Sequence, residues 1–104
     1  MKVVDIPYVQ GFSGRKKDKI VKKIRHKRKV DKVYVVTLPL ITDGIMDIYE
    51  YKHLFQKFYK KASEEIIVLG IAKSKSDAKE VVRDIVQDMY DADAGFDVKK
   101  FFGI

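Results

Sequence analysis

The sequence predicts a small α/β (or α+β) sandwich of two layers, in which two main helices pack on a mixed sheet of three to four strands. Two apolar, β-branched runs at residues 33–38 and 66–72 do not alternate with polar residues, which is typical of strands covered on both faces. Residues 51–62 and 77–91 instead repeat apolar side chains every three or four positions, as helices do. A length of 104 residues suits one core, so we expect a single domain over residues 1–104.

The order of these segments predicts how the strands pair. Pro39 cannot donate a hydrogen bond to a neighbouring strand, so it ends the first run. Because a helix separates the two strands, we expect them to pair in parallel through a right-handed crossover, with 66–72 as the central strand. Asp43-Gly44 is also typical of a hairpin turn, after which residues 45–51 could return as an antiparallel strand. The sequence leaves open whether residues 45–51 form a strand or a helix.

The second helix has clear start and stop signals. Ser74 or Ser76 can cap its start, and the acids Asp77 and Glu80 suit the positive end of the helix dipole. Gly95 follows its end, where a left-handed residue is usually needed.

Core positions follow from the same periodicity. The apolar face of the second helix consists of Ala78, Val81, Val82, Ile85, Val86, Met89 and Tyr90. We therefore expect Val82 to be buried against the sheet and Leu69 to be buried in the central strand. The tail at residues 96–102 carries three phenylalanines, so it is expected to fold back onto the domain.

The N-terminal third is less regular. Residues 3–9 have the composition of a strand, but Pro7 restricts that strand to an edge of the sheet. Residues 11–14 are typical of a turn. Residues 15–32 have a narrow apolar stripe, so the sequence leaves open whether they are helical. This apolar stripe consists of Ile20, Val21 and Ile24. We expect the strongly basic segment to precede, and lie outside, a strand-helix-strand-helix core at residues 33–92.

The basic segment is the most distinctive feature of the sequence. The chain has a net charge of +7, of which residues 15–32 contribute +9 and the remaining residues −2. Such crowding of like charges costs stability unless an anionic partner relieves it. The candidate anion-binding residues are Arg15, Lys16, Lys17, Lys19, Lys22, Lys23, Arg25, Lys27, Arg28, Lys29 and Lys32.

Nucleic acid is the expected partner of this segment, because phosphates at regular spacing release counterions when cations replace them. Tyr8 and Phe12 lie beside the segment and could stack on bases. We therefore expect a small accessory protein that binds nucleic acid through phosphates, largely independent of sequence. The alternative is a protein-interaction or oligomerisation module whose basic segment meets an acidic protein or an anionic lipid surface.

The other motifs favour structural roles. The chain has no cysteine, and neither His26 nor His53 has neighbours at the spacing of a metal site or a catalytic triad. The glycine loop at 11–17 lacks the Walker spacing, and the loop at 70–76, with Lys73 and Lys75, looks like any strand-to-helix connection. We expect no enzyme activity and no metal or cofactor.

No apolar run approaches the ~20 residues of a membrane span. The first ten residues include Asp5 and Pro7, so we expect no signal peptide and a cytoplasmic protein.

Overall fold

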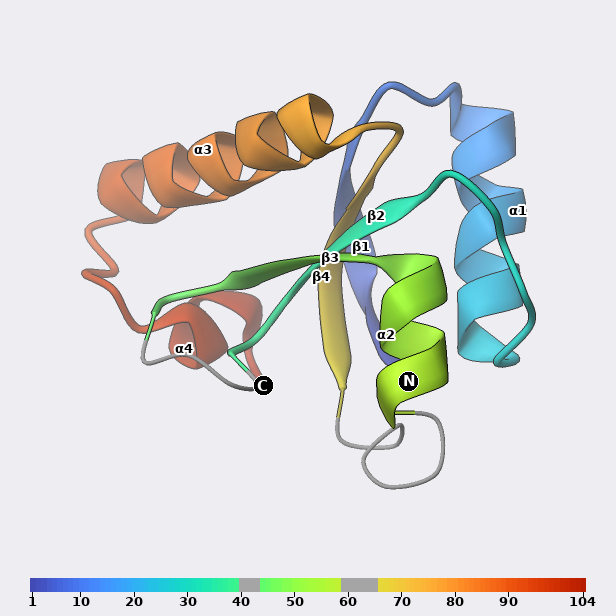
Figure 1. The fold of residues 1–104 in the computed structure, drawn as a ribbon. Coiled ribbons are helices and arrows are strands. Elements are labelled where there is room, and N and C mark those ends of the chain that lie inside the picture. Colours follow the sequence, from blue (N-terminus) through green and yellow to red (C-terminus); the bar gives the residue numbers. More distant parts are fainter. Residues whose placement is uncertain (40–43, 59–65) are drawn as a thin grey trace.

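A mixed sheet of four strands, in the order β1-β4-β2-β3, forms the centre of the computed structural model (Figure 1). The structure describes residues 1–39, 44–58 and 66–104. The strands are β1 (Lys2–Gln10), β2 (Tyr34–Thr37), β3 (Asp47–Glu50) and β4 (Ile67–Ala72). β4 pairs in parallel with β1 and antiparallel with β2, and β3 extends the sheet antiparallel to β2. The predicted mixed sheet, with the run at 66–72 in its centre, is confirmed.

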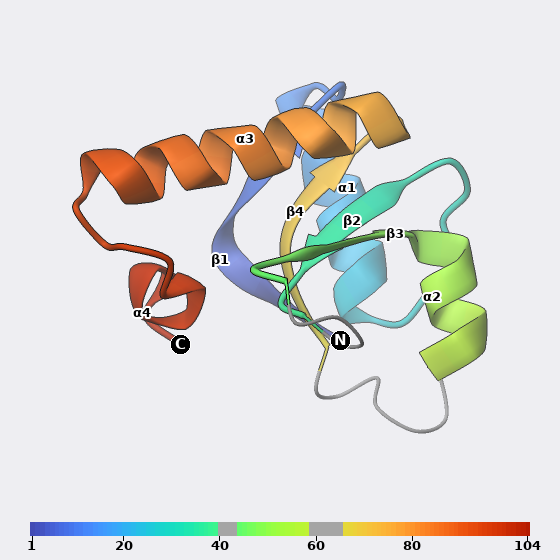
Figure 2. The same cartoon turned by 60° about the vertical axis from the view of Figure 1, so that its left-hand side comes forward.

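Helices pack against this sheet from both sides (Figure 2). Within the described residues they are α1 (Gly14–Arg25), α2 (Tyr51–Phe58), α3 (Lys75–Asp91) and α4 (Val98–Phe102). α1 and α2 share one apolar cluster with the sheet, and α3 and α4 share the other. The predicted α/β class is therefore confirmed.

The predicted parallel crossover between the two apolar runs is wrong. β2 and β4 are antiparallel, with Tyr34 opposite Ala72. The reason is β3, which returns beside β2, with Tyr34 opposite Glu50, before α2 begins. This extra strand reverses the chain once more, so the hairpin alternative for residues 45–51 holds, with β3 at 47–50 leading into α2. Residues 40–43 of the hairpin and residues 59–62 of the predicted first helix lie outside the described residues.

β4 carries a bulge that distributes its side chains between the two clusters. The pairing with β2 skips Leu69, which is an extra residue on the β4 side. The alternation of faces shifts there, so that Val68 and Ile71 both pack into the α1 cluster. Gly70 lies at the bulge, where a Cβ atom would stand 2.6 Å from Val81 Cγ1. The close packing of α3 on β4 therefore requires glycine at this position.

β1 is an edge strand, as Pro7 predicts. Its register with β4 shifts between Val3 and Tyr8, so the ladder is interrupted around the proline. The guanidinium of Arg25, from the end of α1, donates hydrogen bonds to the backbone oxygens of Val3 and Val4, each at 3.3 Å. A side chain of α1 thus occupies main-chain acceptors at this end of the edge strand.

The basic segment is part of the core, which corrects the expectation that it lies outside. α1 buries Ile20, Val21 and Ile24 against the sheet, and Ile24 is 0% exposed. The physical reason is the two-sided burial of β2 and β4. Because α3 covers one face only, the other face needs a helix as well, and three apolar residues of α1 suffice to cover it together with α2.

α3 follows most of its sequence signals. Ser74 caps it, accepting a hydrogen bond from the backbone N–H of Asp77 at 3.1 Å. Leu69 is fully buried as predicted, whereas Val82 is half-buried and the fully buried neighbour is Val81. Tyr90 does not belong to the apolar face, since it is 80% exposed.

The C-terminal segment folds back as α4, as expected from its phenylalanines. Phe101 and Phe102 pack against the α3 cluster, while Phe96 remains 74% exposed. The first left-handed residue after α3 is Asp93 (φ 53°), ahead of Gly95 (φ 62°). The backbone N–H of Ala94 then bonds to the carbonyl oxygen of Met89 at 2.9 Å and closes the helix end.

The packing of α1 against the sheet can be tested by shortening one of its buried side chains. Ile24→Ala should lower the free energy of unfolding by about 2–5 kcal/mol, because it leaves a cavity beneath α1. Val82→Ala, at a half-buried site of α3, is the comparison and should cost less. Urea unfolding followed by circular dichroism measures both. An Ile24→Ala variant as stable as the parent chain would contradict the packing of α1.

Candidate anion-binding groove

The parallel pair β1 and β4 defines one end of the sheet. Each strand runs into a helix there, but α1 goes to one face and α3 to the other (Figures 1 and 2). Adjacent parallel strands whose connections diverge in this way bring two strand-to-helix loops to the same end of the sheet. In open α/β sheets, this is where ligands bind.

The two loops at this end are in direct contact. The backbone N–H of Lys73, after β4, donates to the carbonyl oxygen of Gln10, at the end of β1, at 3.1 Å. Gly11 follows with φ +88°, and a Cβ there would stand 2.6 Å from Lys73 Cβ and 2.7 Å from Asp77 Oδ2. The glycine loop and the lysine loop, separate in the sequence, therefore form one structure.

The two helices that start here differ in charge at their N-termini. Ser13 and Ser74 both cap, and Ser13 Oγ accepts from the backbone N–H of Lys16 at 3.3 Å. α3 has Asp77 in its first turn, where the helix dipole favours an acid. The first turn of α1 contains no acid and begins with basic residues, which the dipole disfavours.

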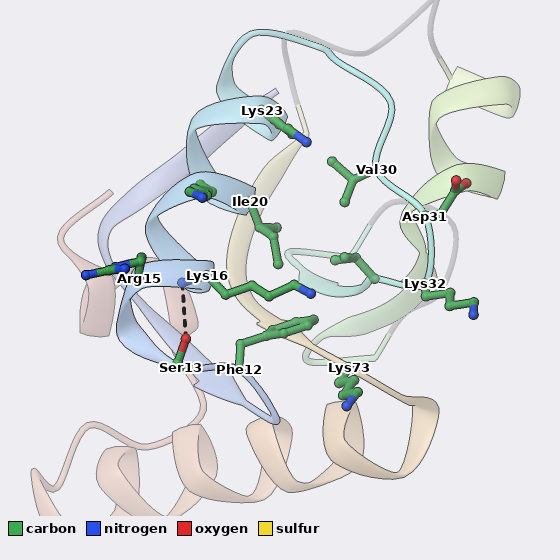
Figure 3. Close-up of a pocket in the computed structure, with 12 residues that line it drawn as sticks. Phe12, Ser13, Arg15, Lys16, Ile20, Lys23, Val30, Asp31, Lys32 and Lys73 are labelled. Carbon is green, nitrogen blue, oxygen red and sulfur yellow. Dashed lines mark hydrogen bonds between the residues drawn. The ribbon is translucent and has the colours of Figure 1, made fainter.

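A hollow of about 540 Å³ opens between the start of α1, the loop before β2 and Lys73 (Figure 3). Its lining joins apolar side chains to cations, and Asp31 is the one acid among the described residues that line it. The apolar lining consists of Phe12, Ile20, Val30 and Val33. The cations are Arg15, Lys16, Lys19, Lys23, Lys32 and Lys73.

The side chains of the hollow are arranged around an open centre. Figure 3 shows the ring of Phe12 and the side chain of Lys16 extending into it, with Lys23 above and Lys73 below. Arg15 points outward from the start of α1. The cations thus come from α1, from the loop before β2 and from the loop after β4.

A second hollow, of about 370 Å³, continues along α1. It shares Lys19 and Lys23 with the first and is lined, within the described part of the chain, by basic residues and a histidine. Its full lining is Lys19, Lys22, Lys23, His26 and Arg28. We refer to the two hollows together as the basic groove.

The basic groove includes seven of the eleven predicted site residues and omits four. Lys17 forms an ion pair with Asp18 at 3.5 Å, and Arg25 bonds to the backbone of β1. Both line a different hollow, which also contains Asp5 and Asp18. Lys27 and Lys29 line neither part of the groove. The hollow that Lys17 and Arg25 line shares Lys22 and His26 with the basic groove, so the two surfaces adjoin along α1.

Sequence reasoning did not include Lys73 in the predicted site. The residue stands in the loop after β4, far from the basic segment along the chain, and reaches the groove because β1 and β4 are parallel neighbours. The sequence signal was the pair of loops with glycine and lysine at 11–17 and 70–76, which the prediction treated as separate turns.

The loop from α1 to β2 is held in place by a buried tyrosine. The hydroxyl of Tyr51, at the start of α2, donates to the carbonyl oxygen of Arg28 at 2.8 Å. Lys27 (φ 55°) and Lys32 (φ 56°) take left-handed backbone conformations, which are strained for residues other than glycine. The bond from Tyr51 anchors the loop that carries Arg28 and Lys32, and both cations line the groove.

A metal-binding cluster is not found among the described residues. No group of three or more His, Asp or Glu side chains is arranged there to hold a metal ion, and His26 and His53 are both exposed. No helix among the described residues has the length and apolar character to cross a membrane.

Compared with family models, curated proteins and solved structures, the chain matches none.

The contact between the two loops predicts opposite effects of two glycine substitutions. Gly11→Ala should destabilise the protein by about 1–3 kcal/mol, because alanine is strained at φ +88° and clashes with Lys73. Gly14→Ala is the matched control. No atom stands within 4 Å of its Cβ position, and alanine in the first turn of α1 should stabilise by about 0.4–1 kcal/mol. Urea unfolding measures the stability of both variants. A Gly11→Ala variant as stable as the parent chain would disprove the contact between the two loops.

Burial raises the pKa of Tyr51 from its ordinary value of 10.0 to about 12. Because the neutral phenol is favoured in the fold, its contribution to stability is complete below pH 10 and is lost as the pH rises towards 12. Tyr51→Phe should therefore cost about 1 kcal/mol at pH 8 and progressively less above pH 10. Unfolding measured across that range, with Tyr90→Phe as the exposed comparison, tests this. A constant difference at all pH values would contradict it.

Proposed function

We propose that the protein is a small, non-enzymatic, cytoplasmic module that binds nucleic acid through phosphate contacts in the basic groove, largely independent of base sequence. The observation that supports this most is the convergence of cations from three separate segments on one concave surface. Lys16 and Lys23 come from α1, Lys32 from the loop before β2, and Lys73 from the loop after β4.

The cations of the groove have few internal partners. In the described part of the chain, the basic segment forms one ion pair, between Lys17 and Asp18, and that pair lines the hollow beside the groove. Burial of the opposite side of α1 holds the helix backbone in place, so its cations stay grouped on the remaining surface of the helix. An anion in the groove would lower the electrostatic energy of this group, which makes the unliganded arrangement favourable for binding.

The start of α1 supports the same conclusion. Cations at the positive end of a helix dipole reduce stability, whereas phosphate there is bound by both the dipole and the free backbone N–H groups. Arg15 and Lys16 occupy that end and also line the groove. A local feature that opposes folding and suits an anion is typical of a functional site.

The shape of the groove favours a polyanion over the alternatives. It follows α1, whose 12 residues span about 18 Å, and a single small anion would leave most of its cations without a partner. Binding to a lipid surface would be strengthened by exposed apolar anchors beside the cations. The exposed large apolar side chains of the described residues do not line the groove: Ile6, Ile45, Tyr90, Phe96 and Ile104.

A salt titration tests the proposal. If five to seven cations contact phosphates at once, log affinity for duplex DNA should fall against log salt with a slope of roughly −4 to −6. The triple variant Lys19→Gln/Lys23→Gln/Lys73→Gln should make that slope shallower by about 2–3 and weaken all sequences about equally. Fluorescence anisotropy with labelled oligonucleotides measures both.

The control variant Lys79→Gln/Lys99→Gln/Lys100→Gln removes the same charge from exposed positions on α3 and α4. It should leave the slope nearly unchanged. No binding at low salt, or equal effects of the two variants, would refute the proposal. Tighter binding to acidic liposomes or to an acidic polypeptide than to nucleic acid would favour the interaction-module alternative.

A further inference from the structure

We infer that the larger hollow of the basic groove holds one unpaired base stacked on Phe12, so that the groove selects single-stranded over duplex nucleic acid. The inference rests on the proposed function and adds to it the class of nucleic acid. Its basis is the apolar part of the hollow, which phosphate contacts alone do not explain.

An anion site needs cations and backbone N–H groups, but this hollow also has an apolar wall. Ile20 and Val33 are buried behind it, while Phe12 and Val30 are half-buried and still reach the surface. At about 540 Å³ the hollow is within the size range of pockets that hold small organic groups. An aromatic face beside cations is the arrangement that binds single strands, because every base can stack on it.

The position of Phe12 is fixed by its neighbours along the chain. Gly11 holds the loop against Lys73, and Ser13 caps α1, so Phe12 lies between two restrained residues. Figure 3 shows its ring directed into the hollow beside Lys16, while Lys23 and Lys73 lie on opposite sides. A base on the ring would therefore have cations on both sides of it for the two adjoining phosphates.

The second hollow indicates that the occupant is longer than one nucleotide. It begins at Lys19 and Lys23 and extends to Arg28, away from Phe12. A free mononucleotide in the first hollow would leave Arg28 without a phosphate. In a duplex the bases are paired and stacked, so its phosphates can reach the rim but its bases cannot enter. A single strand can fill both hollows at once.

The experiment compares three ligands of equal length by anisotropy at one salt concentration. They are a thymidine oligomer of about ten nucleotides, a duplex, and an abasic oligomer that keeps the phosphates but has no bases. Stacking of one base predicts that the thymidine oligomer binds about 5- to 150-fold more tightly than the abasic one. Phe12→Leu should remove most of this advantage and leave the abasic affinity unchanged, and an unchanged circular dichroism spectrum would show that the variant is folded.

A second measurement does not depend on loss of binding. The chain contains no tryptophan, so Phe12→Trp introduces a single indole at the hollow. Its fluorescence should be quenched by the thymidine oligomer and not by the abasic one, with the base preference retained. Equal binding of the two oligomers, or tighter binding of the duplex, would overturn the inference and leave phosphate binding intact. Binding of none of the three ligands would overturn the proposed function itself.

Discussion

The burial of β4 on both faces is the constraint on which the rest of the structure depends. Val68 and Ile71 face one cluster, and Leu69 and Ala72 face the other, so the strand is stable only with helices on both sides. α3 covers one of these faces with an ordinary amphipathic sequence. The second side is covered by α1 together with α2. α1 contributes only three buried apolar residues, so this requirement packs a highly charged segment against the sheet.

The need to cover this face of the sheet with α1 explains the position of the basic groove. Packing fixes one side of α1, so its cations must project from the remaining sides, and one flank adjoins the loop before β2. The parallel pairing of β1 and β4 then brings Lys73 to the same place. The packing that stabilises the sheet thus also positions the charges, and an anionic ligand of the kind proposed would reduce the electrostatic cost of that positioning.

Short sequence patterns were sufficient to predict the elements whose structure depends on residues near them in the chain. The apolar runs predicted β2 and β4, Pro7 predicted an edge strand, and the serines at 74 and 76 predicted a capped start of α3, where Ser74 is the cap. The direction of β2 against β4 was not predictable, because it depends on β3, for which the hairpin and helix signals at residues 45–51 were balanced. The role of Lys73 was beyond local reasoning, since it depends on pairing between residues about 60 positions apart.

The bonds from Arg25 to the carbonyl oxygens of Val3 and Val4 have a consequence for self-association. An edge strand is a template on which a second copy can extend the sheet, and proteins with exposed edges aggregate by this route. Here the guanidinium must leave before another strand can pair at that end. Because Arg25 is outside the basic groove, this protection would persist if the proposed ligand neutralised the groove. Copies crowded along one polyanion would remain separate molecules there, without their sheets merging at this end.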